Sequence, residues 1–217
     1  LSDKGWVRCA KGHDVDGNSL QYKAGDGYKS SASGRSNQYA AFIDSSGRSF
    51  AAEAHDLPSA RGQGEPLTGR FALGAGEEVR HLVMGNEGEP YLICSDAGYG
   101  FVCTNDDLIG KNKNGKALLT VPEGGQVMAP QKIGSPETDL CMAISNEGRM
   151  LLFPLSTLPV LGKGKGNKLI SIPSARVKAR EEFMVMAAII PQGQYVTLFA
   201  GKRKLTLKPS DLDYYRG

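Results

Sequence analysis

The hydrophobic positions of this chain form short runs separated by tight turns. Runs such as Ala41-Phe42-Ile43 precede a turn, and runs such as Phe101-Val102-Cys103 follow one. Glycine accepts the positive φ that a tight turn needs, so Asp or Asn followed by Gly between two apolar runs predicts a β-hairpin. Four such turns occur: Asp3-Lys4-Gly5, Asp44-Ser45-Ser46-Gly47, Asp96-Ala97-Gly98 and Asn146-Glu147-Gly148.

These turns belong to an internal repeat. The turn glycines stand at 5, 47, 98 and 148, so the period is roughly 42 to 51 residues. A leucine follows ten residues later at Leu57, Leu108 and Leu158, and after a Gly-rich basic loop we expect a strand to restart at Leu67, Leu118 and Leu169. A fifth, weaker copy starts near Gly201 and keeps the strand Leu205-Thr206-Leu207 and the leucine Leu212.

A repeat of about 50 residues with four short strands has the length of one propeller blade. We therefore predict an all-β, propeller-like fold of about five four-stranded blades, in a single domain over residues 1–217. The sequence leaves open whether the ring of blades is closed or broken. The stretch from Ser174 to Glu182 reads as a short helix or a basic loop; we expect the loop, leading into a strand at Phe183 to Ile190.

The composition agrees with a β fold that has many turns, since 28 of the 217 residues are glycine and 11 are proline. This length can bury a substantial core. No apolar run is long enough to span a membrane, so we expect no membrane partner. The chain starts without Met and enters a strand-like segment at once, so we expect it to be a fragment of a longer polypeptide.

Several short motifs resemble metal-binding, phosphate-binding or catalytic motifs but lack residues that those motifs require. The four cysteines form no Cys-x-x-Cys pair, so we expect buried thiols and no metal site. Gly110 to Ala117 nearly spells a phosphate-binding P-loop, but it ends in Ala117 and runs into what reads as a strand. His55-Asp56 has no supporting nucleophile or metal motif and is expected to be a surface turn. We also expect Gly98-Tyr99-Gly100 to be a hairpin turn and Trp6 to pack within a blade. No catalytic residue or bound cofactor is predicted for this domain.

The net charge is only +3, but the basic residues recur in phase with the repeat. Lys and Arg gain affinity for duplex DNA by releasing counterions from the phosphates, and glycine lets a backbone approach a phosphate closely. No recognition helix or repeated aromatic platform accompanies them, so we expect duplex binding without base reading. The predicted DNA contacts are Lys163, Lys165, Lys168, Lys111, Lys113, Lys116, Arg61, Arg48, Arg149, Lys202, Arg203, Lys204, Arg176, Lys178 and Arg180.

The chain also resembles a known family. The similarity is carried by Leu1 to Trp6, Leu57 to Leu67, Ser95 to Val102 and Gly162 to Lys168, in the right order and at the right spacing. These runs resemble the C-terminal domain of the A subunit of bacterial topoisomerase IV, and the resemblance covers essentially the whole chain. The C-terminal domain of the DNA gyrase A subunit is related to this family.

The resemblance implies a β-pinwheel that binds and bends duplex DNA along a basic outer perimeter and guides DNA segments to a catalytic core. Strand cleavage by a tyrosine of the N-terminal region, and ATP and magnesium use elsewhere in the enzyme, lie outside this chain. The implied partners are the B subunit plus a second A subunit, through regions that this chain does not include. The expected location is the cytoplasm, on the nucleoid, with the isolated domain a monomer.

One departure from the relatives concerns DNA wrapping. Gyrase carries a Gln-Arg-Arg-Gly-Gly-Lys-Gly box, and this sequence has only degenerate counterparts at Ser59 to Gly64 and Gly162 to Lys168. The resemblance therefore implies decatenation and relaxation for the parent enzyme, rather than introduction of negative supercoils. Two other functions stay open: a propeller used as a protein-interaction platform, and a stand-alone enzyme, which the lack of a nucleophile–base pair or metal cluster disfavours.

Overall fold

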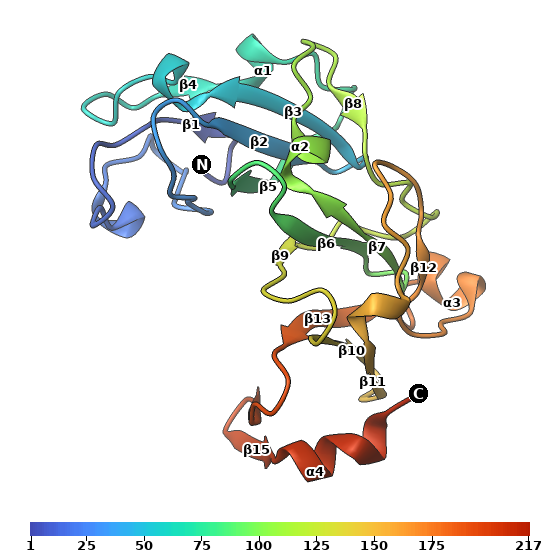
Figure 1. Ribbon diagram of the computed structural model, residues 1–217. Helices are drawn as coiled ribbons and strands as arrows, with labels where there is room; N and C mark the ends of the chain where they lie inside the picture. Colours follow the sequence, from blue (N-terminus) through green and yellow to red (C-terminus); the bar gives the residue numbers. More distant parts are fainter. The chain divides into compact units, whose positions relative to one another are not determined.

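The computed structural model describes residues 1–217 and contains fifteen strands in five sheets, with only short helices between them (Figure 1). This confirms the all-β prediction and the expectation of about five blade-like sheets. Contacts within the chain group it into two compact units. The first comprises Leu1–Glu89 and Thr104–Thr120, and the second comprises Pro90–Cys103 and Val121–Gly217. That the chain forms a single domain stays a prediction.

The first unit holds two sheets. A two-stranded sheet pairs β1 (Trp6–Val7) with β4 (Glu65–Pro66), and a four-stranded sheet has the order β5-β2-β3-β8. Its strands are β2 (Tyr39–Asp44), β3 (Arg48–Glu53), β5 (Val79–Met84) and β8 (Lys116–Ala117). The helical segments are η1 (Gly17–Ser19), η2 (Ala54–Asp56), α1 (Leu67–Arg70) and α2 (Asn105–Leu108).

The second unit holds three sheets, ordered β12-β7-β6-β9, β11-β10-β13 and β14-β15. Their strands are β6 (Pro90–Ser95), β7 (Tyr99–Thr104), β9 (Gln131–Lys132), β10 (Leu140–Ser145), β11 (Met150–Pro154), β12 (Asn167–Lys168), β13 (Met184–Ile190), β14 (Val196–Ala200) and β15 (Arg203–Leu207). The helical segments are η3 (Leu155–Thr157), α3 (Ser174–Lys178), α4 (Pro209–Leu212) and η4 (Asp213–Tyr215). Two of the five sheets have the four predicted strands; the others have two or three.

The predicted turns stand where the pattern placed them. Gly47 and Gly98 have φ of 86° and 83°, and each donates its N–H to the carbonyl three residues earlier, at 3.1 Å. Gly5 and Gly148 do the same, and Gly201 forms the turn of the fifth hairpin with φ of 60°. A short helical turn then follows the second strand of four hairpins, as η2, α2, η3 and α4.

The outer strand of a hairpin sheet comes from a later part of the chain. Lys116 pairs with Ser49 in the first unit, and Asn167 pairs with Gly100 in the second. These outer strands, β4, β8 and β12, lie just before Leu67, Leu118 and Leu169, so the prediction that strands start at these leucines was wrong. Each leucine instead gives its N–H to the carbonyl of a turn glycine, which ends the pairing with the strand.

The apolar runs supply the cores. Phe42 and Phe50, from paired strands, are fully buried, and Phe71 packs on both with ring centroids 5.6 and 5.1 Å apart. In the second unit, Leu92 and Cys94 belong to a core cluster that also draws on β7, β10, β11, β13 and α3. Central strands are buried on both faces, which explains why they read as continuous apolar runs and not as alternating ones.

The segment from Ser174 to Glu182 corrects one expectation. It begins with the helix α3 instead of continuing as a loop, because Val177 turns inward to a buried position and donates its N–H to the carbonyl of Pro173 at 3.1 Å. The helix ends before Arg180, whose φ is +57°. The strand predicted from Phe183 to Ile190 is confirmed as β13, one residue shorter.

None of the helices in this structure has the length and apolar character required to cross a membrane.

Candidate nucleic-acid interface

Three basic loops occupy equivalent places in successive repeats. Each loop ends in an outer strand, β4, β8 or β12, which pairs with residues one and two positions after a turn glycine. The next residue closes the loop. Leu67 donates to Gly5 at 2.9 Å, Leu118 to Gly47 at 3.1 Å and Leu169 to Gly98 at 2.8 Å. The repeat seen in the sequence therefore fixes each loop at the same position on its own sheet.

Glycines hold these loops against the sheets. Gly64, Gly115 and Gly166 all have positive φ, and a Cβ at each would overlap the backbone carbonyl of Val7, Ser49 or Gly100. Those three carbonyls belong to residues two positions after a turn glycine. The loop glycines thus allow the loops to pack against the sheets. This role is separate from the close approach to a phosphate that the sequence predicts for them.

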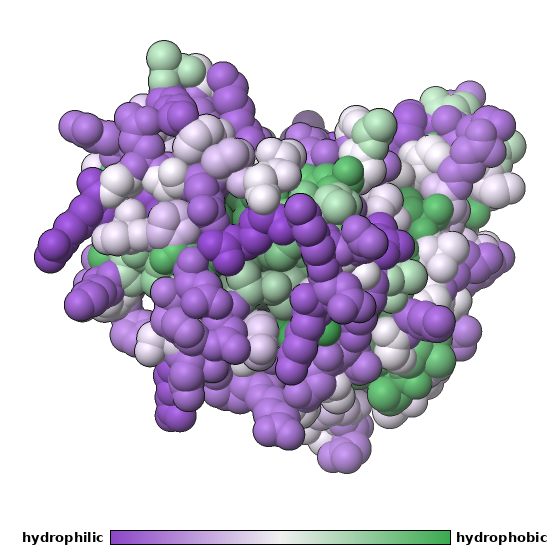
Figure 2. Space-filling model, turned by 90° about the horizontal axis from the view of Figure 1, so that it is seen from above, coloured by the Kyte–Doolittle hydropathy of each residue, from purple (hydrophilic) through white to green (hydrophobic).

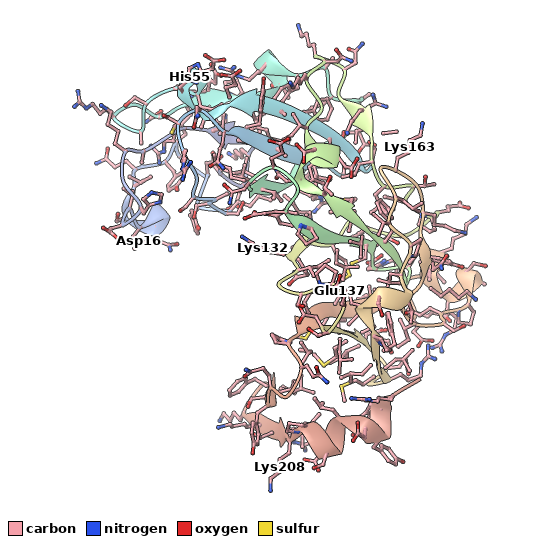
Figure 3. The ribbon with its side chains drawn as sticks, in the orientation of Figure 1. Asp16, His55, Lys132, Glu137, Lys163 and Lys208 are labelled. Atoms are coloured by element: carbon pink, nitrogen blue, oxygen red, sulfur yellow. The ribbon has the colours of Figure 1, made fainter.

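The loop lysines project into solvent without acidic partners. Lys163, Lys165 and Lys168 carry side chains that take part in no ion pair, and all three residues are exposed. In Figure 3 the side chain of Lys163 extends away from the ribbon. Lys165 lies over the ring of Tyr99, with Nζ 4.4 Å from the centroid. An ammonium on an aromatic face keeps its charge, so this contact orients the side chain without neutralising it.

The loop in the first unit has the same character. Lys111 and Lys113 are exposed and Lys116 is half-buried, and none of them pairs with a carboxylate. Lys111 lies over the ring of Tyr39, with Nζ 5.0 Å from the centroid. Arg61, in the first loop, is also exposed, and no group in the protein accepts a hydrogen bond from its guanidinium.

The last hairpin carries Lys202, Arg203 and Lys204 at its turn, all exposed. Lys204 lies 6.0 Å from the ring centroid of Phe199 on the facing strand.

In the face of the molecule shown in Figure 2, hydrophilic residues predominate and hydrophobic ones show between them.

Arg48 and Arg149 are engaged in contacts within the protein. Arg48 donates through Nε and Nη2 to the carbonyl of Asn114, at 3.0 and 2.6 Å, and so clamps the lysine loop to β3. Arg149, at the equivalent position after its turn glycine, donates to the carbonyl of Ser171 at 2.8 Å and pairs with the buried carboxylate of Glu182. Both arginines donate to a backbone carbonyl, and Arg149 in addition pairs with a carboxylate.

The basic residues of the α3 segment are paired as well. Arg176 lies 2.8 Å from Glu182, and Lys178 lies 2.7 Å from Glu123. Arg180 reaches the buried Asp96 at 2.8 Å and stacks on Phe183. Of the fifteen predicted contacts, Arg149, Arg176, Lys178 and Arg180 pair with carboxylates, and Arg48 donates to backbone carbonyls. The other ten have no ion-pair partner within the protein.

Some exposed basic residues escaped the sequence reading. Lys11, Lys23 and Arg35 lie in the long segment between β1 and β2, which has no counterpart in the other repeats. These residues have no equivalent positions in the neighbouring copies of the repeat, so the repeat does not predict them.

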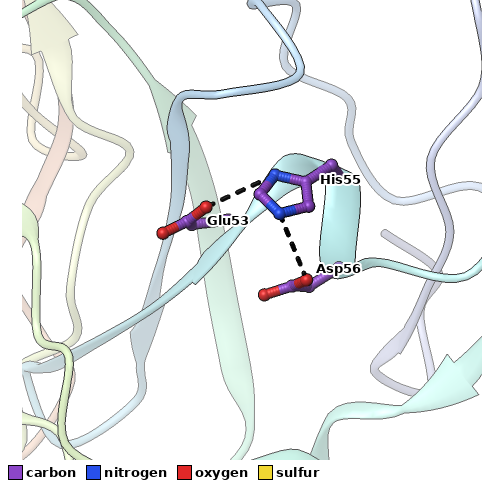
Figure 4. Close-up of side chains that lie close together, drawn as sticks. All are labelled: Glu53, His55 and Asp56. Atoms are coloured by element: carbon purple, nitrogen blue, oxygen red, sulfur yellow. Dashed lines mark ion pairs between the residues drawn. The ribbon is translucent and has the colours of Figure 1, made fainter.

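The motifs set aside on sequence take the expected local forms. His55 and Asp56 lie in the exposed segment η2, with Nδ1 of His55 3.3 Å from Glu53 and Nε2 3.4 Å from Asp56 (Figure 4). These three side chains offer ligand atoms within 4.8 Å of one another. They lie at the surface and use both imidazole nitrogens, so the arrangement is that of an exposed charge cluster. The P-loop-like stretch leads into β8, and no helix follows it.

The cysteines also behave as predicted for buried thiols. Cys94, Cys103 and Cys141 are fully buried, and Cys9 is half-buried. Burial raises the pKa of Cys141 to about 12, and burial, with the nearby Cys141 and Asp96, raises the pKa of Cys94. A thiol that holds its proton is a poor nucleophile and a poor metal ligand.

Comparison with known proteins agrees with this architecture. The family model of the DNA gyrase C-terminal domain, a β-propeller, matches residues 90–133 and 139–184. The A subunit of DNA topoisomerase 4 from Pseudomonas aeruginosa is 55% identical over the whole chain, and its counterpart from Escherichia coli K12 is 50% identical. The chain spans 29% of the length of each of these relatives.

Solved structures show the same relationship. The structure of the E. coli ParC C-terminal domain matches with a TM-score of 0.94 and 50% identity, covering 100% of this chain and 88% of that one. The DNA gyrase A C-terminal domain matches with a TM-score of 0.65 at 14% identity, over 97% of this chain and 70% of that one, which shows a shared fold. With its repeated hairpins and interlocked outer strands, the chain belongs to the family formed by the C-terminal domains of topoisomerase IV A subunits, which is related to the DNA gyrase A C-terminal domain.

Proposed function

We propose that this domain binds duplex DNA without sequence preference and bends it, through the basic loops that end in β4, β8 and β12 and through the turn at residues 202–204. The observation that carries the proposal is the equivalence of the three loops. Each is held to its own sheet by the leucine-to-glycine hydrogen bond, and each presents at least one cation that no carboxylate neutralises. The proposed contacts are Arg61, Lys111, Lys113, Lys116, Lys163, Lys165, Lys168, Lys202, Arg203 and Lys204.

The chemistry of these loops suits a phosphate track. Exposed ammonium groups gain affinity by displacing condensed counterions, whatever the base sequence. The longest helix, α3, has five residues, so the domain offers no element of the size that reads a major groove. Curving a site of 20–30 bp by 40–90° costs roughly 1–6 kcal/mol, which several phosphate contacts can offset.

Within the longer polypeptide, this domain would guide DNA segments to the catalytic core of topoisomerase IV for ATP-dependent decatenation and relaxation. Cleavage, ATP hydrolysis and the contacts with the B subunit or with a second A subunit would belong to other regions, in the bacterial cytoplasm. The loops at Ser59 to Gly64 and Gly162 to Lys168 lack the full gyrase box. We therefore propose bending without gyrase-like wrapping.

The test is the affinity of the 217-residue chain for a linear duplex of random sequence, measured as a function of salt. With six to ten phosphate contacts, affinity should fall about 10³- to 10⁵-fold between 50 and 200 mM salt. A duplex of unrelated sequence should bind equally well, because no base edges are read. A shallow slope, or a strong preference for one sequence, would contradict a phosphate track.

A second function is favoured by one local feature. The last hairpin exposes large apolar side chains, with Phe199 at 74%, Tyr195 at 64% and Leu205 at 50% exposure. Exposed aromatic residues are typical hot spots of protein interfaces. If the chain fails to bind duplex DNA even at low salt, a protein-interaction platform centred on this hairpin becomes the better account.

A further inference from the structure

The first unit contains a pocket that the basic loops do not use. Its volume is about 480 Å³, within the range of small-molecule sites. One side is formed by the long segment between β1 and β2, and the other by residues of β1, β2, β5 and η2. All the lining residues belong to this one unit.

One wall of the pocket is apolar and aromatic. Trp6 is half-buried at the start of β1, and Leu20, Leu57, Leu82 and Met84 also line the space. Such a wall gains free energy by burying an apolar or aromatic group, at about 25 cal/mol per Å² of apolar surface removed from water.

The segment between β1 and β2 brings positive charge onto this wall. Lys23 has its Nζ 3.4 Å from the centroid of the Trp6 ring, and the exposed Lys11 also lines the pocket. The Arg8 guanidinium lies 4.7 Å from the centroid of the Tyr22 ring and is held there by bonds to the carbonyls of Gly62 and Gln21. The cations therefore border the aromatic wall directly.

Asp26 carries the single carboxylate among the lining residues, and it does not neutralise the charge of these cations. Asp26 accepts hydrogen bonds from Ser2 Oγ at 2.7 Å and from the N–H groups of Lys4 and Gly27, each at 2.9 Å. Partial burial alone would raise the pKa of Asp26, but these bonds outweigh it and lower the pKa. Its oxygens are thus committed to the loop around them.

Unused donors complete this side. The hydroxyl of Ser30 is buried at the pocket without a hydrogen-bond partner. The N–H groups from Ser31 to Gly34 donate to no group of the protein. Hydroxyl and N–H donors next to cations are the groups that bind phosphate oxygens.

We propose that this pocket binds a nucleotide, with the base against the apolar wall of Leu20, Leu57, Leu82 and Met84 and the phosphate at Lys23, Lys11 and the donors of Ser30 to Gly34. An aliphatic ligand would form no ion pair with the cations. An inorganic anion would leave the apolar wall exposed to water. A base within an intact duplex is stacked and cannot enter. The ligand is therefore a free nucleotide or an unpaired nucleotide of a DNA strand, and the site is separate from the proposed duplex track.

Trp6 is the only tryptophan of the chain, so its fluorescence reports on this pocket. Adenosine monophosphate, titrated into the 217-residue chain, should change the emission of Trp6 in a saturable way. Adenosine and ribose 5-phosphate, each half of the ligand, should bind at least about tenfold more weakly, because each uses one wall only. A second titration compares a blunt duplex with the same duplex carrying an unpaired adenine overhang, and again follows the emission of Trp6.

Two variants locate the site, with binding followed by ligand-observed NMR. Lys23→Gln should weaken binding of the monophosphate about tenfold and binding of adenosine by less, since the charge-assisted contact to the phosphate is lost. Ala32→Trp, on the loop whose backbone N–H groups donate to no group of the protein, should fill the pocket and abolish binding of both ligands. Lys163→Gln, in a basic loop, should lower duplex affinity without affecting the nucleotide.

Saturable binding of the monophosphate alone identifies a free nucleotide as the ligand, and a response to the overhang alone identifies an unpaired DNA nucleotide. Absence of both responses, in a chain that still binds duplex in the salt titration, overturns the pocket proposal alone. Binding that survives Ala32→Trp overturns it as well. Loss of duplex binding with nucleotide binding intact would overturn the proposed function alone.

Discussion

Leu169 donates its backbone N–H to the carbonyl oxygen of Gly98 over 2.8 Å, and this bond closes the lysine loop 162–168 onto the turn between β6 and β7. Leu118 and Gly47 make the same contact in the preceding repeat. One residue type at the end of each loop thus anchors a glycine-rich, basic segment to the turn of a hairpin. The positions of the lysines follow from this anchor.

Gly166→Ala should displace the anchored loop. Gly166 has φ of 78°, and a Cβ would overlap the backbone of Gly100. The left-handed conformation costs an alanine about 1–2 kcal/mol, and the clash adds roughly 1–3 kcal/mol. We expect a lower urea midpoint and weaker DNA binding. Gly148→Ala is the matched control, because Gly148 has the same φ of 78° and open space around it, so only the conformational cost applies. Equal effects of the two substitutions would contradict a packing role.

Neutralising Lys163, Lys165 and Lys168 to glutamine should flatten the salt dependence of duplex binding. Three lost phosphate contacts correspond to a decrease of about 2 to 3 in the log–log slope. Stability should change little, since these side chains have no ion-pair partner. Lys178→Gln serves as the comparison, because Lys178 already pairs with Glu123 at 2.7 Å. An unchanged slope in the triple variant would move the DNA track away from this loop.

Arg149→Ala should act on stability first. Glu182 is 2% exposed and is paired with Arg149 and Arg176, so removal of one arginine leaves a buried carboxylate poorly compensated. Breaking such a pair costs about 3 kcal/mol or more. Chemical denaturation measures this loss. Lys178→Ala removes an exposed pair and should cost less than about 1 kcal/mol. If Arg149→Ala left stability intact but reduced DNA affinity, Arg149 would belong to the DNA track after all.

The buried thiols predict an alkaline loss of stability. Burial raises the pKa of Cys141 to about 12, so the folded chain keeps a proton that the unfolded chain releases. The stabilising contribution is complete below the unfolded thiol pKa of about 8.5 and declines as pH rises from there towards the folded value. Urea midpoints across this range should therefore fall less for Cys141→Ala than for the unsubstituted chain. Parallel curves for the two proteins would show that this thiol does not couple to folding.

A thiol reagent gives an independent view of the same burial. At pH 8 the folded chain should expose one reactive group, Cys9, which is half-buried near the surface. Cys94, Cys103 and Cys141 should react only at the rate at which the chain opens, because each is fully buried. Rapid reaction of more than one thiol in the folded chain would contradict these cores.

Local chemistry made much of this fold predictable. The turns at Gly47 and Gly98 could be predicted because a tight turn depends on a few consecutive residues, here a short polar residue followed by a glycine with positive φ. The fifth hairpin was found in the same way, from a weaker copy around Gly201. The helix α3 was missed, since whether Val177 turns inward depends on a core built from distant strands.

The sequence by itself determined the repeat, the hairpins and the in-phase placement of the basic loops, because these depend on residue types at fixed spacing. Tertiary structure decided which cations are available. Arg149 was predicted to contact DNA together with the loop lysines, yet it pairs with Glu182, which lies 33 residues away along the chain. The nucleotide-sized pocket likewise joins Trp6 to Met84 across the first unit. Contacts between residues distant in sequence arise only when the strands pair, so no local pattern records them.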